Sequence, residues 1–257
     1  MSSSHGTFVW YELMTTDTKA AENFYHNVIG WDAKDAGMPG VQYTLLSANG
    51  TQVAGLMELP KAASEAGARS GWNGYVAVDD VDARATQFEK AGGHIHRAPD
   101  DIPGVGRFAM VSDPQGAVLA LFKGAPGSEA PPAASATPGY GGWRELQAAE
   151  WQAAFAFYAD LFGWTKAEAV DMGPMGVYQI FAIDGEMIGG MMTKPEAVPA
   201  PFWLYYFNID AIEAAKTRVE ARGGKIVNGP HQVPGGSWIV HCLDPQGAMF
   251  ALVGPRL

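Results

Sequence analysis

Apolar residues recur at three- to four-residue spacing between positions 21 and 29, which predicts an amphipathic helix. Asp17 stands where a helix N-cap is expected, and Gly30 stands where glycine commonly ends a helix. Residues 8–14 before this helix are rich in β-forming side chains, and β-like segments follow it with a hairpin signal at Asn49-Gly50. Residues 8–58 therefore predict a β-α-β-β-β module.

The same order of elements is expected three more times, over about 72–123, 143–192 and 202–254. Trp-Tyr-Glu-Leu at 10–13 returns as Trp-Arg-Glu-Leu at 143–146, and Asp-Pro-Gln-Gly-Ala at 113–117 returns unchanged at 244–248. Phe-Tyr with Gly-Trp five residues beyond the Tyr stands at 24–31 and at 157–164. An offset of about 130 residues is the size of one domain. We predict two tandem domains, 1–123 and 143–257, joined by a Pro-, Gly- and Ala-rich linker at 124–142.

Four such modules, with an Asp-Pro-x-Gly turn before the last strand of each domain, resemble the vicinal oxygen chelate superfamily. The Trp-x-Glu-Leu strand and the Gly-Trp helix end resemble, more narrowly, the tandem glyoxalase-like proteins of bacteria, including a mycobacterial secreted-antigen group. The resemblance implies an α+β fold of two glyoxalase-like domains. Each domain would be a pair of βαβββ modules that forms a cupped mixed sheet, with helices outside and a ligand inside.

The resemblance also implies three metal-ligand positions per domain, which many relatives fill with His, Gln or Glu. In this sequence they fall on Trp10, Asn73 and Ala120, and on Trp143, Leu204 and Ala251. None of these is a good ligand, so we expect no metal and no cofactor. His94 and His96 lie two residues apart on one strand, a spacing that two ligands of one metal ion can have. A third ligand is not evident, and whether the two histidines bind a metal stays open.

If the ligand positions face the cup, strand alternation turns a mostly aromatic set of side chains with a few polar groups inward. The candidate ligand-binding residues are Trp10, Tyr43, Asn73, Tyr75, Met110, Trp143, Tyr178, Tyr206 and Asn208. Three candidates for acid–base catalysis join them: Glu12, Glu145 and His241. A structural role remains the alternative for each, with the glutamates tied to neighbouring donors and the histidine satisfied in the core.

Charge and composition limit the classes of molecule that this protein is expected to bind. The formal net charge is −10 and no run of Lys or Arg occurs, which argues against nucleic acid and anionic membranes. The start of the chain lacks the pattern of a signal peptide, and the single cysteine suits a reducing compartment. We therefore expect a cytoplasmic protein, monomeric or homodimeric, whose partner is a small molecule.

These observations favour a glyoxalase/bleomycin-resistance-like protein with degenerate metal sites. It would bind a small carbonyl or aromatic molecule in one or both cups, by sequestration or by metal-independent chemistry. If it is an enzyme, a lyase or an oxidoreductase is expected. The alternative is a metal-dependent lyase or dioxygenase of the glyoxalase I or extradiol type, with ligands that the sequence does not reveal.

Overall fold

A computed structural model describes residues 4–38, 40–127 and 136–257 of the chain. It contains two mixed eight-stranded sheets with helices, so the predicted α+β class and the four βαβββ modules are confirmed. Part of the predicted linker, residues 128–135, lies outside the described residues.

The first sheet has the strand order β2-β3-β4-β1-β5-β8-β7-β6. Its elements and their connecting helices are β1 (Phe8–Thr15), α1 (Thr18–Ile29), β2 (Asp32–Asp35), β3 (Tyr43–Ala48), β4 (Thr51–Glu58), α2 (Lys61–Glu65), β5 (Gly71–Ala77), α3 (Val81–Lys90), β6 (His94–Ile102), β7 (Gly106–Ser112) and β8 (Val118–Gly124).

The second sheet repeats this arrangement with the order β10-β11-β12-β9-β13-β16-β15-β14. Its elements are β9 (Gly141–Ala148), α4 (Trp151–Phe162), β10 (Thr165–Asp171), the 3-10 helix η1 (Gly173–Met175), β11 (Val177–Ile183), β12 (Glu186–Thr193), β13 (Phe202–Asn208), α5 (Ile212–Ala221), β14 (Lys225–Gln232), β15 (Trp238–Leu243) and β16 (Met249–Gly254).

Local sequence signals determine where these elements begin and end. The Asp17 side chain accepts a hydrogen bond from the Ala20 amide and caps α1, and Gly30 ends the helix in the left-handed conformation at φ 92°. Asn49 and Gly50 both have positive φ, as the tight hairpin between β3 and β4 requires. The predicted helix boundaries and hairpin are therefore confirmed.

The described residues pack into two compact units that each draw on both sequence repeats. The first unit comprises the described residues of Met1–Val9, Gly74–Ala130 and Trp143–Leu204, and the second those of Trp10–Asn73, Pro131–Gly142 and Tyr205–Leu257. Each unit thus contains one module from either repeat. The domain boundaries at 123 and 143 describe the repeats of the sequence and stay a prediction.

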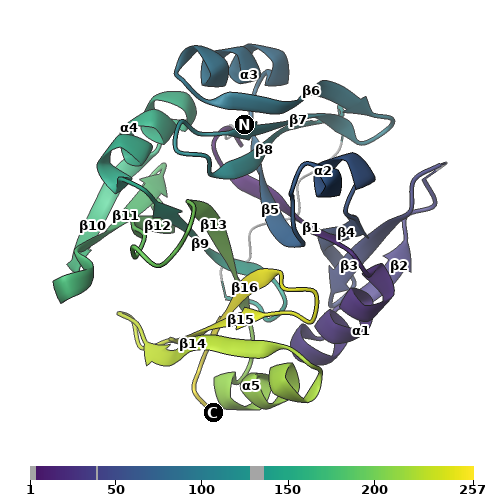
Figure 1. Cartoon of the computed structure of the whole chain (residues 1–257), viewed down its shortest axis with the longest axis vertical. Helices are drawn as coiled ribbons and strands as arrows, with labels where there is room; N and C mark the ends of the chain where they lie inside the picture. The colour runs from purple at the N-terminus through teal and green to yellow at the C-terminus, as the bar shows by residue number, and fades with distance from the viewer. Residues whose placement is uncertain (1–3, 39, 128–135) are drawn as a thin grey trace. The chain divides into compact units, whose positions relative to one another are not determined.

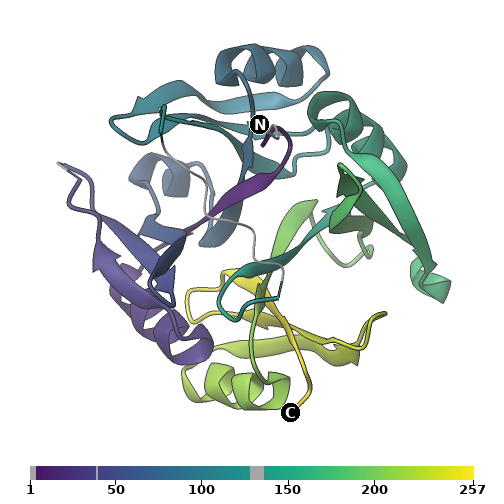
Figure 2. The ribbon, with the colours of Figure 1, turned by 180° about the vertical axis from the view of Figure 1, so that it is seen from behind.

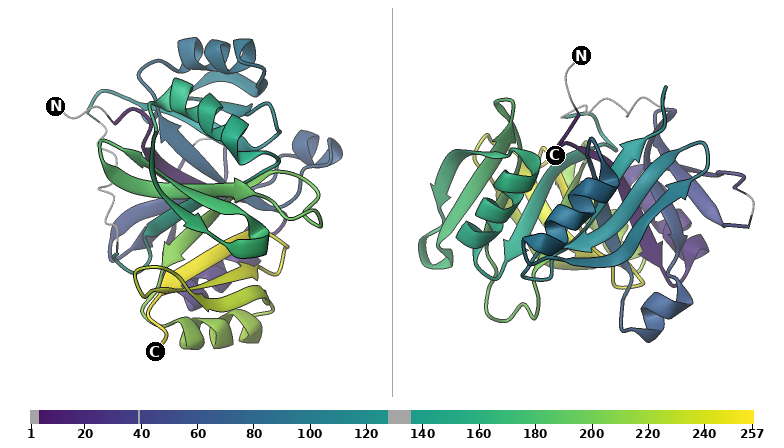
Figure 3. Two further views of the ribbon diagram at one scale, coloured as in Figure 1. Left: turned by 90° about the vertical axis from the view of Figure 1, so that its left-hand side faces the viewer. Right: turned by 90° about the horizontal axis from the view of Figure 1, so that it is seen from above.

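In the first unit, α3 and α4 lie side by side (Figures 1 and 3), and the ring centroids of Phe88 and Phe157 are 5.0 Å apart. In the second unit, α1 and α5 are neighbours (Figure 2), and Phe24 packs against Phe250 at 5.8 Å between ring centroids. Aromatic residues that the sequence repeats therefore join one repeat to the other within each unit.

Two buried hydrogen-bond chains fix these contacts, and we call them the Trp–Tyr–Asp chains. In the second unit the Trp72 indole donates to the Tyr25 hydroxyl (2.9 Å), which donates to Asp244 Oδ2 (3.1 Å). In the first unit Trp203, Tyr158 and Asp113 repeat the chain, at 3.3 and 3.0 Å.

The aspartates of these chains belong to the repeated Asp-Pro-Gln-Gly-Ala motif. Oδ1 of Asp244 accepts from the backbone amides of Gln246 and Ala248, so the carboxylate closes its own turn while Oδ2 binds Tyr25. Burial raises the pKa of this carboxyl, and the bonds from the turn amides and from Tyr25 oppose that shift. Both oxygens have defined partners, which explains why the motif is the same in both repeats.

Candidate functional site

Strand β1 carries two predicted site residues, Trp10 and Glu12, on the same face as Met14. Leu13 points to the other face and is fully buried, whereas Glu12 pairs with Gly55 of β4 and Met14 pairs with Met57. Side chains alternate along a strand, so Trp10, Glu12 and Met14 share a face.

Tyr43 of β3 joins this face and forms a cluster with Trp10 and Glu12. The Trp10 indole donates a hydrogen bond to the Tyr43 hydroxyl at 3.0 Å. Burial raises the pKa of Tyr43 well above 10.0, and the charge of Glu12 and a hydrogen bond to that carboxylate raise it further. The phenol therefore stays neutral at physiological pH and serves as a donor. We call these three residues the first Trp–Tyr–Glu cluster.

The second Trp–Tyr–Glu cluster consists of Trp143, Tyr178 and Glu145 in the first unit. Trp143 donates to the Tyr178 hydroxyl at 2.7 Å, and this hydroxyl donates to Glu145 Oε2 at 3.1 Å. Burial again raises the pKa of Tyr178 well above 10.0, followed by the charge of Glu145. In both clusters the phenol therefore lies between the indole and the carboxylate.

A glycine lies beneath the tyrosine ring in both clusters. A Cβ on Gly55 would be 1.9 Å from the Tyr43 hydroxyl oxygen, and one on Gly190 would be 2.2 Å from Tyr178 Cε1. Gly190 pairs with Glu145 as Gly55 pairs with Glu12. Glycine inside a strand is a sign of close approach, and this signal could have identified the two positions from the sequence.

The second cluster has one further polar neighbour, Gln147, which strand alternation places on the same face of β9 as Trp143 and Glu145. Its Nε2 donates to Glu145 Oε1 at 2.5 Å, so both carboxylate oxygens accept a hydrogen bond. The residue is only 8% exposed. At the matching place on β1 stands Met14, which has no such donor.

Four of the remaining predicted site residues form two smaller groups. In the second unit the Tyr206 hydroxyl lies 2.8 Å from His241 Nε2, and both residues pair with Ala251 across the sheet. In the first unit Tyr75 and Met110 both pair with Ala120. The structure therefore brings together Tyr206 with His241, and places Tyr75 and Met110 in one row.

Asn73 and Asn208 lie on β5 and β13. Asn73 is partly exposed. Asn208 is buried, and its backbone binds Tyr140 and Gly139, with N to O distances of 2.9 and 2.8 Å. A Cβ on Gly142 would lie 2.3 Å from Asn208 Oδ1, so this glycine admits the amide.

The side chains at the metal-ligand positions implied by the resemblance do not suit a metal. Ala120 and Ala251 are fully buried and offer no donor atom, and Leu204 is equally unsuitable. Among the described residues, no group of three or more His, Cys, Asp or Glu side chains is arranged to hold an ion. His94 and His96 contact each other at 4.8 Å between ring centroids, and His96 bonds Ser112 Oγ.

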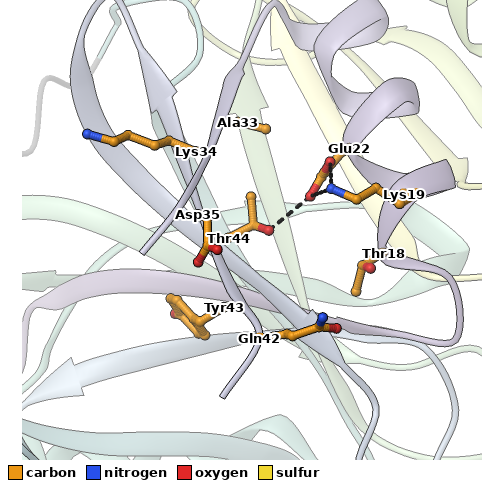
Figure 4. Close-up of a pocket in the computed structure, with 9 residues that line it drawn as sticks. All are labelled: Thr18, Lys19, Glu22, Ala33, Lys34, Asp35, Gln42, Tyr43 and Thr44. Atoms are coloured by element: carbon orange, nitrogen blue, oxygen red, sulfur yellow. Dashed lines mark hydrogen bonds and ion pairs between the residues drawn. The ribbon is translucent and has the colours of Figure 1, made fainter. Parts of the chain in front are cut away.

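Two hollows in the second unit lie near the first cluster. A pocket of about 160 Å³ between α1, β2 and β3 contains Glu22, whose carboxylate binds Lys19 and Thr44 (Figure 4). A larger, more open hollow of about 650 Å³ is lined by Val41, Met57 and Leu59 among others. Tyr43 lines the smaller pocket, and Met57, which lines the larger hollow, pairs with Met14 and with Tyr43 across the sheet.

In the described ranges, no helix is both long enough and hydrophobic enough to cross a lipid bilayer.

Sequence comparison gives the relatives of this chain. A protein of Mycobacterium bovis named "Putative glyoxylase CFP32" is 32% identical over 256 residues, which cover 97% of this chain and 95% of that protein. The "Anthracycline biosynthesis protein DnrV" of Streptomyces peucetius is 32% identical over 266 residues, covering 98% of this chain and 94% of the relative.

The fold is also that of solved structures. The crystal structure of the Mn(II)-bound glyoxalase from Novosphingobium aromaticivorans aligns with a TM-score of 0.64 at 16% identity, over 99% of this chain and 83% of that one. The profile of the Glyoxalase/Bleomycin resistance protein/Dioxygenase superfamily matches residues 7–121 and again 142–252. The expected resemblance is confirmed, and the chain belongs to this superfamily as a tandem glyoxalase-like protein.

Proposed function

We propose that each repeat binds a small planar molecule with an aromatic ring or a carbonyl group on the face of its Trp–Tyr–Glu cluster. The observation that carries this proposal is the recurrence of the same indole–phenol–carboxylate arrangement over a glycine in both repeats. Indole and phenol rings offer flat apolar surface, and the glutamate adds a charged acceptor.

The surroundings support a ligand of this kind. The hollow of about 650 Å³ that reaches Met57 is within the size range of small-molecule sites. The name of the Streptomyces peucetius relative points to anthracyclines, which are polycyclic aromatic carbonyl compounds. The positions where relatives hold a metal lack suitable ligand atoms in this chain, which favours sequestration or metal-independent chemistry. In the second case Glu12, Glu145 or His241 would exchange a proton with the ligand.

Binding can be tested with 1-indanone, an aromatic ketone, by intrinsic fluorescence and thermal shift. We expect quenching and a higher melting temperature, and we expect Trp10→Leu with Trp143→Leu to reduce both. Trp151→Leu is the matched control, because Trp151 lies on α4 against Lys166 rather than in a cluster. Unchanged binding in the double variant would refute the proposed site.

Elemental analysis of the purified protein separates this proposal from the metal-dependent alternative. We expect no stoichiometric Ni, Zn, Fe or Mn, and we expect binding of 1-indanone to survive chelator treatment. A bound metal whose removal abolishes ligand binding would favour a lyase or dioxygenase of the glyoxalase I or extradiol type. The cytoplasmic location and the monomeric or homodimeric state remain predictions.

A further inference from the structure

Gln147 holds its amide in one orientation. Nε2 donates to the Glu145 carboxylate, and turning the amide over would place its carbonyl oxygen against a carboxylate oxygen instead. Because two acceptors repel each other, the orientation follows from the chemistry of Glu145 and is not an arbitrary assignment. The carbonyl oxygen, Oε1, must therefore point away from Glu145.

This carbonyl oxygen is a buried acceptor. Gln147 is 8% exposed, and among the residues that the structure describes none donates a hydrogen bond to Oε1. Buried acceptors are nearly always satisfied in proteins, so a buried oxygen without a protein donor indicates a partner from outside the chain, either a ligand group or an ordered water that a ligand donor can replace. Gln147 also lies on the face of β9 that carries Trp143 and Glu145.

We propose that Gln147 Oε1 accepts a hydrogen bond from the ligand of the second Trp–Tyr–Glu cluster, and that this ligand is neutral and carries an O–H or N–H donor. This inference rests on the proposed function and specifies its second site. An anionic ligand is disfavoured there, because Glu145 and the Gln147 carbonyl both present negative charge or partial charge. A ligand without a donor would leave Oε1 unsatisfied.

The first cluster supplies the contrast within the same molecule. Met14 occupies the place of Gln147 and pairs with Met57 as Gln147 pairs with Met192. A thioether is at most a weak acceptor, so the first cluster has no reason to prefer a donor at this position. The two repeats would therefore share affinity for flat rings and differ in their demand for a donor group.

Indole and benzofuran test this difference, because they have nearly the same shape and only indole carries an N–H. In one NMR titration of the whole protein, the backbone amide of Gly190 reports on the second cluster and that of Gly55 on the first. We expect indole to bind about ten-fold more tightly than benzofuran at Gly190, as one additional satisfied acceptor implies. At Gly55 we expect affinities within about two-fold of each other, for want of that acceptor.

Gln147→Met should remove the preference at Gly190 and leave the Gly55 titration unchanged. The wild-type comparison remains decisive if this variant does not fold. Equal affinities for indole and benzofuran at Gly190 in the wild type would overturn the role of Gln147 while the proposed aromatic site stands. If neither compound shifts either glycine signal, the proposed function fails together with this inference.

Discussion

The Trp–Tyr–Asp chains and the Trp–Tyr–Glu clusters use the same three groups in the same order, yet they differ in how far they are enclosed. Trp72 and Trp203 of the chains are buried, whereas Trp10 and Trp143 of the clusters are partly exposed. Both arrangements repeat without a change of residue type, but beside the clusters one repeat has Met14 where the other has Gln147. The partly exposed indoles of the clusters can contact a ligand, whereas the enclosed chains can only stabilise the packing of each unit.

The largest effect that we expect is a loss of folding stability at high pH, and buried tyrosines of both the chains and the clusters contribute to it. Burial raises the pKa of Tyr25, Tyr43 and Tyr178 well above 10.0, so the folded state keeps protons that the unfolded state loses near pH 10. Their stabilisation is complete below pH 10 and is lost as pH rises further. The free energy of unfolding should fall by up to about 4 kcal/mol per pH unit for the three together.

Absorbance titration checks this prediction, since a phenolate absorbs ultraviolet light at a longer wavelength than the neutral phenol. In the folded protein these three tyrosines should resist ionisation, while all tyrosines should ionise together in the urea-unfolded chain. If every tyrosine of the folded protein ionised near pH 10, neither arrangement would enclose its phenol, and the comparison would lose its basis.

Asp244→Ala tests the enclosed chains. The substitution leaves the buried Tyr25 hydroxyl without its acceptor and removes the acceptor for two turn amides. We expect a loss of about 3 kcal/mol in unfolding free energy, measured by urea denaturation. Asp113→Ala should lose a similar amount, because its contacts are the same. A loss below about 1 kcal/mol in either variant would show that the chain is dispensable.

Gly55→Ala tests the packing of the clusters. The new methyl group would displace the Tyr43 ring, so we expect a loss of about 2 kcal/mol in stability and weaker ligand binding. Gly71→Ala is the control, because the nearest atom to its Cβ would be 3.8 Å away. Equal stability of the two variants would mean that the tyrosine ring does not depend on the glycine.

Glu12→Gln and Glu145→Gln test the clusters with the smallest change, because glutamine preserves volume and removes charge. We expect each to cost about 1 kcal/mol of stability, as a charged hydrogen bond becomes a neutral one. Ligand affinity should fall more in Glu145→Gln, whose cluster is the more polar. If Glu145→Gln changed stability alone, the glutamate would be part of the scaffold.

Much of the fold follows from local patterns. Helix periodicity, the cap at Asp17 and the turn at Asn49-Gly50 depend on neighbours in sequence, so they could be predicted without coordinates. The pairing of Phe24 with Phe250 could not, because the apolar face of α1 would suit a partner from either repeat. The recurrence of aromatic motifs indicated two cores but not which modules share them.

The candidate site was predictable to a similar degree. Alternation along β1 and β9 correctly places each tryptophan and glutamate on one face. The orientation of the Gln147 amide depends on Glu145 and Tyr178 together, and the need for Gly55 depends on where the Tyr43 ring lies. Such details arise from side-chain geometry in three dimensions, and the pattern of residue types does not contain them.

Because each compact unit takes one module from either repeat, the two copies of the duplicated sequence are not free to evolve separately. A substitution at Tyr25 in one copy must be compatible with Asp244 in the other, and Tyr158 and Asp113 form the reciprocal constraint. Gene duplication usually releases one copy to diverge or decay. In this chain the contacts between the copies constrain both of them. Substitutions are tolerated more readily at positions such as 14 and 147, where a change in one copy does not alter the carboxylate partner of a tyrosine in the other.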